Sequence, residues 1–138
     1  MAVAQESCDS TSAFKKTANG GMFTQKEACG DADIITTFRC VKGKATIDTV
    51  MNIAMEGQKS GAKLQQGFEF SGKNIKQEVN VIDAASIQMD LATDGELWRG
   101  LSTPGLDVYM KDNGGSTAIS TVSSSRKNLA KFKKECGL

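Results

Sequence analysis

The alternation of apolar and polar side chains is the feature that most restricts how this chain can fold. Between residues 33 and 122 the period is two, as in the run Ala45, Ile47, Thr49, Met51, Ile53 and Met55. Such a pattern predicts strands with one buried face. Turn signals at Ser71-Gly72, Asp94-Gly95 and Asp112–Gly115 separate these runs. We therefore expect a mainly β fold, an antiparallel sandwich or barrel of seven to eight strands.

Both ends of the chain show helical signals. Ser12–Ala18 has the composition of a short helix, and Thr24 and Glu27 have the spacing of a capping box. Near the C-terminus Leu129, Phe132 and Cys136 fall on one helical face. We expect a single domain over residues 1–138, with α+β character. Its predicted parts are a disulfide-stapled helical or loop segment at 8–30, a β core at 33–122 and a helix at 124–136.

Four cysteines in 138 residues favour a disulfide framework. They are Cys8, Cys29, Cys40 and Cys136, and they allow three connectivities. We favour Cys8–Cys29, which would staple the N-terminal segment, together with Cys40–Cys136, which would tie an early strand to the C-terminal helix. The chain contains neither a C-x-x-C pair nor a histidine, so we expect neither a metal site nor a cofactor.

The first residues resemble the end of a processed leader. Ala2-Val3-Ala4 is the small-residue pattern at which a secretory signal peptide is cut. We interpret the chain as a periplasmic or secreted protein whose signal peptide has been removed, with Met1 added as a new start. No apolar run reaches the roughly 18 residues of a membrane span. The net charge of +1 gives no strong attraction to nucleic acid.

The absence of histidine excludes several enzyme classes. Ser-His-Asp and Cys-His nucleophiles cannot be built, and no glycine-rich phosphate loop occurs. Two carboxylates could still hydrolyse glycosides, so a carboxylate-dependent hydrolase is an alternative function. The acidic candidates occupy separate strands or turns, where solvated side chains are the simpler interpretation: Glu69, Glu78, Asp90 and Glu96.

Two segments carry candidate binding residues. A short polar loop between two amphipathic strands is a common binding arrangement, and it comprises Ser71, Gly72, Lys73 and Asn74. Tryptophan and arginine are enriched in binding hot spots, which adds Trp98 and Arg99. A plain hairpin turn and a tryptophan packed in the core are the alternatives. On a strand, these two neighbours would point to opposite faces.

The expected C-terminal helix is strongly basic. Its cations are Arg126, Lys127, Lys131, Lys133 and Lys134. An anionic partner would suit this helix, but the aromatic content of 6% offers no stacking platform for nucleic acid. We interpret the cations as a solvated helix face.

Several short segments resemble the bacterial membrane-bound and periplasmic inhibitors of c-type lysozyme. Thr37–Lys44 resembles the opening aromatic-x-Cys strand of that family. Leu64–Gly67, followed by Ser71-Gly72, is similar to the segment that leads into the family's inhibitory Ser-Gly loop. Trp98-Arg99-Gly100 is similar to its later Trp-x-Lys-Gly strand. The family has a tyrosine soon after the Ser-Gly pair, where this chain has Asn74 and Ile75.

The resemblance implies a small antiparallel β-barrel whose loop inserts into the lysozyme cleft. It also implies that a C-terminal cysteine, here Cys136, pairs with the early one. The tail from Leu97 to Cys136 is similar to small periplasmic proteins of the invasion-associated type. The predicted function is non-catalytic protein binding outside the cytoplasm, with lysozyme inhibition through Ser71, Gly72 and Lys73. The alternative is a secreted or periplasmic host-interaction or structural protein without an enzyme target.

Overall fold

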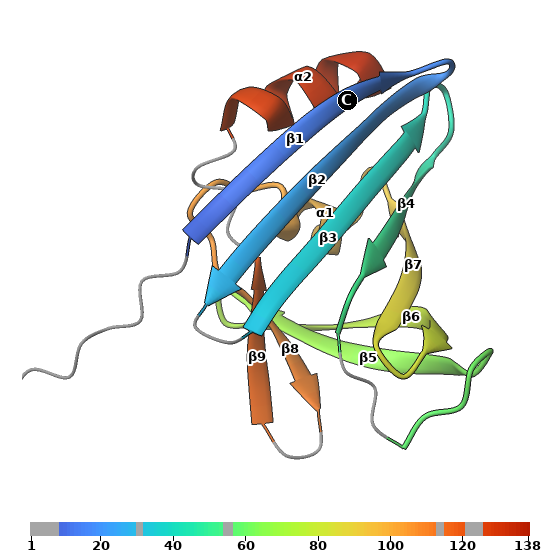
Figure 1. Ribbon diagram of the computed structural model, residues 1–138, viewed down its shortest axis with the longest axis vertical. Helices are drawn as coiled ribbons and strands as arrows, with labels where there is room; N and C mark the ends of the chain where they lie inside the picture. Colours follow the sequence, from blue (N-terminus) through green and yellow to red (C-terminus); the bar gives the residue numbers. More distant parts are fainter. Residues whose placement is uncertain (1–8, 30–31, 54–56, 113–114, 121–125) are drawn as a thin grey trace, which may run out of the picture.

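Nine β-strands form one antiparallel sheet around two helices in this computed structural model (Figure 1). The structure describes residues 9–29, 32–53, 57–112, 115–120 and 126–138. The strands are β1 (Asp9–Thr17), β2 (Gly20–Cys29), β3 (Ala32–Val41), β4 (Thr46–Met51), β5 (Lys63–Phe70), β6 (Lys73–Asp83), β7 (Ser86–Ala92), β8 (Val108–Asp112) and β9 (Gly115–Ser120). The helices are α1 (Glu96–Leu101) and α2 (Arg126–Cys136). The expected mainly β, antiparallel fold is confirmed, with nine strands instead of seven to eight.

The sheet is built from two meanders, β1 to β4 and β5 to β7, and the β8–β9 hairpin. Its strand order is β1-β2-β3-β4-β7-β6-β5-β8-β9. The second meander, β5 to β7, runs back toward the first, so that β7 lies beside β4. Helix α1 then carries the chain from β7 to β8, which pairs with β5. The three strands of the β5–β7 meander therefore lie between β4 and β8 in the sheet.

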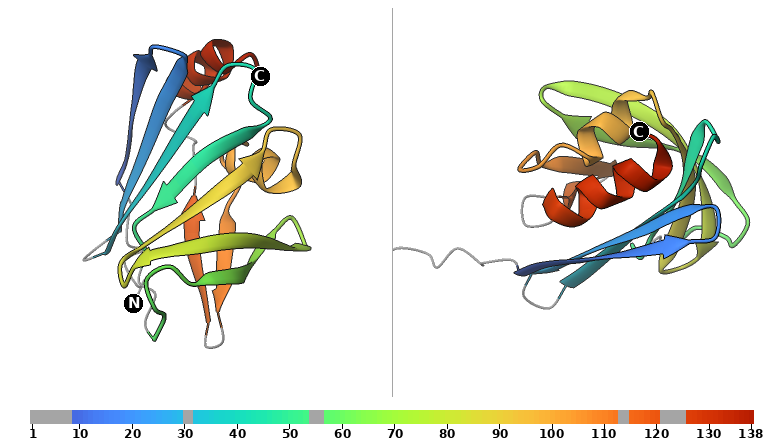
Figure 2. Two further views of the ribbon diagram at one scale, coloured as in Figure 1. Left: turned by 90° about the vertical axis from the view of Figure 1, so that its right-hand side faces the viewer. Right: turned by 90° about the horizontal axis from the view of Figure 1, so that it is seen from above.

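The sheet curves strongly and encloses both helices on its concave side, as the view from above shows (Figure 2, right). It has the form of an incomplete barrel with β1 and β9 as its two edges. A sheet that is apolar on one face buries that face by curling around covering elements. Helix α2 packs on β1 and β2, and α1 packs on β6 and β7. The C-terminal helix expected at 124–136 is thus confirmed over Arg126–Cys136.

Aromatic side chains form the centre of the core. Phe23 on β2 and Phe38 on β3 are direct cross-strand partners, with ring centroids 5.9 Å apart. Phe132 of α2 lies 6.0 Å from Phe23, and Trp98 of α1 lies 5.4 Å from Phe38. Trp98 and Phe132 also meet edge to face at 5.9 Å. Stacked and edge-to-face aromatic pairs at these separations contribute beyond their buried area, so one cluster holds the sheet and both helices together.

A disulfide joins β3 to the last residue of α2. Cys40 and Cys136 are bonded, with their Cα atoms 5.9 Å apart and both residues buried. Gly20 of β2 passes directly against this cross-link, because a Cβ built on it would lie 2.2 Å from the Cys40 carbonyl oxygen and 3.1 Å from its Sγ. Only glycine fits at this close approach. The favoured Cys40–Cys136 pairing is confirmed. The second pairing involves Cys8, which lies outside the described residues.

The helical or loop segment expected at 8–30 is wrong, because its described residues, 9–29, form the β1–β2 hairpin. The two strands pair continuously from Asp9↔Ala28 to Thr17↔Gly20. The capping-box residues Thr24 and Glu27 occupy β2, and Glu27 is buried. Pairing with β3 along the whole of β2 satisfies the backbone and places Phe23 in the core. Long-range pairing has overridden the local capping signal.

The segment around Trp98 also differs from expectation. The β core expected over residues 33–122 includes this segment, but the structure has helix α1 over Glu96–Leu101. Leu97, Trp98, Gly100 and Leu101 are all buried in it. A single helical turn buries adjacent side chains that a strand would send to opposite faces. The crossing from β7 to β8 inside the concave face provides the enclosed environment that this turn fills.

We expect replacement of both Cys40 and Cys136 by alanine to lower the free energy of unfolding by about 4–5 kcal/mol. The disulfide joins residues 96 positions apart in the sequence, and a cross-link over so long a loop restricts the unfolded chain strongly. Urea denaturation of the double variant and the unsubstituted protein, both without reductant, measures the difference. A loss below about 1 kcal/mol would show that the cross-link contributes little to holding α2 in place.

We expect Gly20→Ala to destabilise the fold by about 1–3 kcal/mol, because the new methyl group would overlap the backbone of Cys40. Gly67→Ala is the matched control, since a Cβ there has no neighbour closer than 3.8 Å. Thermal unfolding followed by circular dichroism compares the two. Equal melting temperatures for both variants would refute the close approach at Gly20.

Candidate functional site

A two-residue turn on the surface joins β5 and β6. Phe70 pairs with Lys73, so Ser71 and Gly72 alone form the turn. Both have positive φ angles, 50° for Ser71 and 74° for Gly72. This is the signature of a type I′ hairpin turn, which usually carries asparagine or aspartate followed by glycine. Ser71 is the only non-glycine residue with positive φ in the described part of the chain, and it lies at an exposed tip.

The four predicted residues of this turn are all on the surface. Ser71, Gly72, Lys73 and Asn74 are each exposed. In the left view of Figure 2 the β5–β6 turn is one of the outermost points of the molecule. A two-residue turn that continues two paired strands has few backbone conformations available. The turn therefore presents a serine, a lysine and an asparagine on a rigid support.

The turn is supported from within by α1. Phe70, the last residue of β5, is buried, and its ring lies against Gly100 so closely that a Cβ on Gly100 would come within 2.8 Å of it. This contact brings the Trp98-Arg99-Gly100 segment next to the base of the hairpin. Two segments that the sequence separates by almost thirty positions are thereby placed on the same side of the molecule.

The two remaining candidates have different positions. Trp98 is 5% exposed and packs on Phe38 and Phe132, so its indole belongs to the core and presents no binding surface. Arg99 is exposed on α1. Its backbone carbonyl accepts hydrogen bonds from the hydroxyl of Thr103 at 2.6 Å and from that of Ser102 at 3.4 Å. These contacts anchor the end of α1 and leave the guanidinium directed to solvent.

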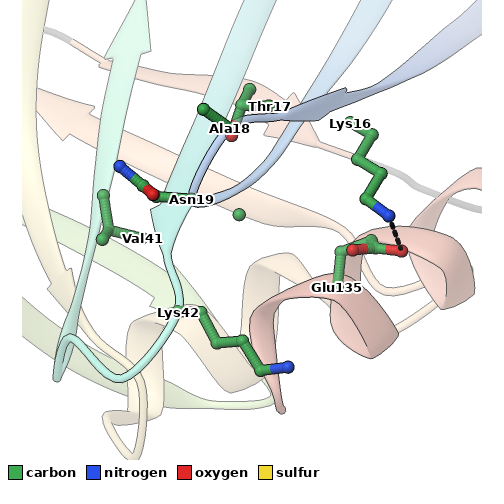
Figure 3. Close-up of a pocket in the computed structure, with 8 residues that line it drawn as sticks. Lys16, Thr17, Ala18, Asn19, Val41, Lys42 and Glu135 are labelled. Carbon is green, nitrogen blue, oxygen red and sulfur yellow. Dashed lines mark ion pairs between the residues drawn. The ribbon is translucent and has the colours of Figure 1, made fainter.

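A shallow pocket of about 570 Å³ lies between the β1–β2 turn, the end of β3 and α2 (Figure 3). Its lining consists of Lys16, Thr17, Ala18, Asn19, Gly20, Val41, Lys42 and Glu135. Lys16 forms an ion pair with Glu135 of α2 at 3.9 Å, and Val41 is 45% exposed. Sequence reasoning did not identify this pocket, because it forms only where the β1–β2 turn meets the end of α2.

Two carboxylates meet on the convex face. Asp48 of β4 and Asp90 of β7 are direct cross-strand partners, a pairing of like charges that is unfavourable by itself. The amide of Gln88 separates them, because its Nε2 donates to Asp48 Oδ1 at 2.8 Å and to Asp90 Oδ1 at 3.0 Å. Asn80 donates in turn to Gln88 Oε1 at 2.6 Å.

This network does not resemble a hydrolytic site. Asp48 and Asp90 lie on the outer surface of the sheet, since their neighbours Ile47, Met89 and Leu91 are the residues buried inside. Of the other acidic candidates, Glu69 forms an ion pair with Lys111, whereas Glu78 and Glu96 are exposed. Glycoside hydrolysis requires two carboxyl groups that flank a substrate in a cleft. The geometry favours the solvated, hydrogen-bonded interpretation of these carboxylates.

Within the described residues, no group of three or more cysteine or acidic side chains is arranged to hold a metal ion. Across the same part of the chain, neither helix has the length and apolar character that crossing a bilayer requires. No family model, curated protein or solved structure matches this chain.

The carboxyl group of Asp83 has a lowered pKa. The pKa of Asp83, at the β6–β7 turn, is lowered by a hydrogen bond from the backbone N–H of Ala85, and further by the hydroxyl of Ser86. The corresponding distances to Asp83 Oδ1 are 2.8 Å and 2.9 Å. An aspartate that accepts these bonds stabilises the two-residue turn in its ionised form.

We expect stability to depend on the ionisation of Asp83 in acid. Because the pKa of Asp83 is lower in the folded state than in the unfolded state, its ionised form contributes to the free energy of unfolding. This contribution is complete when the pH is above the unfolded-state pKa, and it is lost as the pH falls through the folded-state pKa. Ser86→Ala removes one donor and should move the pKa of Asp83 upward. NMR titration of the Asp83 carboxyl carbon in both proteins measures it. An unchanged midpoint in the variant would exclude the Ser86 hydroxyl as a cause.

Proposed function

We propose that this protein is a non-catalytic binding domain that acts outside the cytoplasm and recognises another protein through the β5–β6 turn. The observation that carries the proposal is the conformation of Ser71, a non-glycine residue at φ 50° on an exposed turn. A left-handed conformation costs a serine about 1 kcal/mol. Residues in such sparsely populated conformations cluster at active sites, ligand-binding sites and switch regions.

The surroundings of the turn support a protein partner. Lys73 and Asn74 flank it, and Arg99 on the adjacent α1 is exposed. This surface combines hydrogen-bonding groups with two positive charges, and it rests on Phe70 and Gly100, which are both buried. A rigid support reduces the entropy that is lost when a partner binds. The arrangement suits insertion into a concave, acidic surface.

A c-type lysozyme is the partner that we propose. The resemblance to the lysozyme inhibitors includes the Ser71-Gly72 pair, and the pair occupies the tip of a hairpin. Lysozyme cleaves its substrate with two carboxyl groups in an open cleft. Lys73, next to the tip, would be attracted to such a site by charge complementarity. Ser71 and Asn74 would supply hydrogen bonds to the walls of the cleft.

A periplasmic or secreted location accords with this function. Disulfides such as Cys40–Cys136 persist in oxidising compartments and are rare in the cytosol. The cross-link ties α2 to β3, and α2 in turn covers the aromatic core. A protein that depends on this bond for its stability would function where reductants are scarce, which is where lysozyme acts on bacteria.

We expect the protein to inhibit c-type lysozyme at micromolar concentration, and Lys73→Glu to weaken inhibition at least tenfold by reversing the charge beside the tip. Lys44→Glu is the matched control, since Lys44 is equally exposed but lies in the β3–β4 turn. Lysis of a bacterial cell suspension measures the activity. Absence of inhibition by the unsubstituted protein would remove lysozyme as the partner, and equal effects of both variants would remove the turn as the contact.

A further inference from the structure

Strand β1 is a long edge of the sheet. Its nine residues, Asp9–Thr17, pair with β2 in an unbroken register, and no other described strand borders its outer side. It contains no proline and no bulge, which are two of the devices that protect edge strands from added strands. In Figure 1, β1 runs along one border of the sheet, with α2 beside it.

The hydrogen-bond alternation of the sheet identifies which backbone groups of β1 face outward. Lys42 N–H donates to the Asn19 carbonyl and Asn52 N–H donates to the Ile35 carbonyl. Each of these bonds marks a hydrogen-bonded residue pair that continues the β2–β3 or β3–β4 register. In an antiparallel sheet, hydrogen-bonded and non-hydrogen-bonded pairs alternate along the strands, so these two pairs fix the pattern for the neighbouring residues.

When this pattern is followed through the β1–β2 register, the N–H and C=O groups of Thr11, Ala13 and Lys15 point toward β2. The backbone groups of Ser12, Phe14 and Lys16 point to the opposite side, away from the sheet. These three residues make no backbone hydrogen bond to any other described segment. They form a row of donors and acceptors that a further strand could pair with.

Two contacts show which side of α2 faces β1. Asn128 Nδ2 donates to Ser12 Oγ at 2.8 Å, and Glu135 forms its ion pair with Lys16 at 3.9 Å. Asn128 and Glu135 are seven residues apart and therefore share a helix face. The core side of the helix, with Leu129, Phe132 and Cys136, lies next to this face.

Three lysines lie beside the face of α2 that carries Asn128 and Glu135, on the side away from the core residues. Lys131 stands between Asn128 and Glu135 at helical spacing, and Lys127 and Lys134 are its neighbours four residues before and three residues after. All three lysines are exposed. Glu135 is the only acidic residue of α2, and it is already paired with Lys16. By helical spacing these lysines lie next to the face of α2 that contacts β1 at Ser12 and Lys16.

We propose that the outer edge of β1 binds an extended acidic peptide segment of a partner protein by strand addition. The backbone of the segment pairs with Ser12, Phe14 and Lys16. Its carboxylates, on alternate residues, lie against Lys127, Lys131 and Lys134. The backbone bonds supply affinity, and the lysine stripe selects for acidic side chains. This surface is built from elements other than the β5–β6 turn and is independent of the function proposed for that turn.

Charge favours an acidic peptide over a second copy of this chain. Pairing two β1 strands would place two α2 helices on the same sheet extension, each with its stripe of lysines. Like charges brought together across an interface are unfavourable. The two lysines within β1, Lys15 and Lys16, add to the repulsion between copies and to the attraction for an acidic segment.

The test uses the full chain and a fluorescein-labelled peptide of alternating glutamate and valine, equal in length to β1. We expect a dissociation constant at or below about 100 µM by fluorescence anisotropy, weakening as salt is added. A peptide with lysine in place of glutamate should bind at least tenfold more weakly. So should a peptide that is N-methylated at alternate residues, because it cannot form the strand ladder.

Two measurements on the protein separate strand addition from simple charge attraction. The triple variant Lys127→Gln, Lys131→Gln, Lys134→Gln should lose about tenfold in affinity, because exposed ion pairs are individually weak and are removed together. The matched control is Lys42→Gln, Lys44→Gln, Lys63→Gln, which should bind normally. In amide exchange, bound peptide should protect Ser12, Phe14 and Lys16 and leave Thr11, Ala13 and Lys15 unchanged.

Any one of four results would overturn the proposal. These are equal binding of the lysine peptide, equal binding of the N-methylated peptide, unchanged affinity of the α2 triple variant, and protection without the alternating pattern on β1. A protein that sediments as a dimer, with the alternating protection present in the absence of peptide, would likewise overturn it by assigning the edge to a second copy.

Discussion

The position of the C-terminal helix inside the curved sheet is the constraint on which the rest of this molecule depends. A half-open sheet leaves its concave apolar face exposed unless something fills it. Helix α2 fills it by inserting Phe132 between Phe23 and Trp98, and the Cys40–Cys136 bond holds its last turn against β3. The backbone of β2 passes so close to Cys40 at Gly20 that no side chain fits there.

Both proposed surfaces are consequences of how the two helices pack. Helix α1 supports the β5–β6 turn through the contact of Gly100 with Phe70, so the turn projects from a rigid base. Helix α2 lies along β1 through Asn128 and Glu135, so its lysines lie next to the face that contacts the sheet edge. Each helix therefore has a buried side that completes the core and an exposed side that gives a neighbouring β element its chemical character.

The sequence predicted the secondary structure correctly where apolar and polar residues alternate along one strand. It failed where pairing with another strand determines the secondary structure. The strand pattern of residues such as Ile47 and Met51 predicted the β core, and Ser71-Gly72 was predicted as a turn. The capping signal at Thr24 and Glu27 gave the wrong element, because β2 is held by β1 and β3 on both sides. Of the two predicted site segments, the turn and Arg99 are exposed, whereas Trp98 is part of the core.

The amino-acid sequence by itself determined the β character, the turn between β5 and β6, the amphipathic C-terminal helix and the thiols available for cross-linking. Those properties depend on periodicity and residue type, which neighbouring residues express directly. Tertiary structure alone decided that the N-terminal segment is a hairpin, that Trp98 packs on Phe38, and that α2 contacts β1 through Asn128 and Glu135. These outcomes depend on contacts between residues far apart in the chain, and a local sequence pattern cannot predict such contacts.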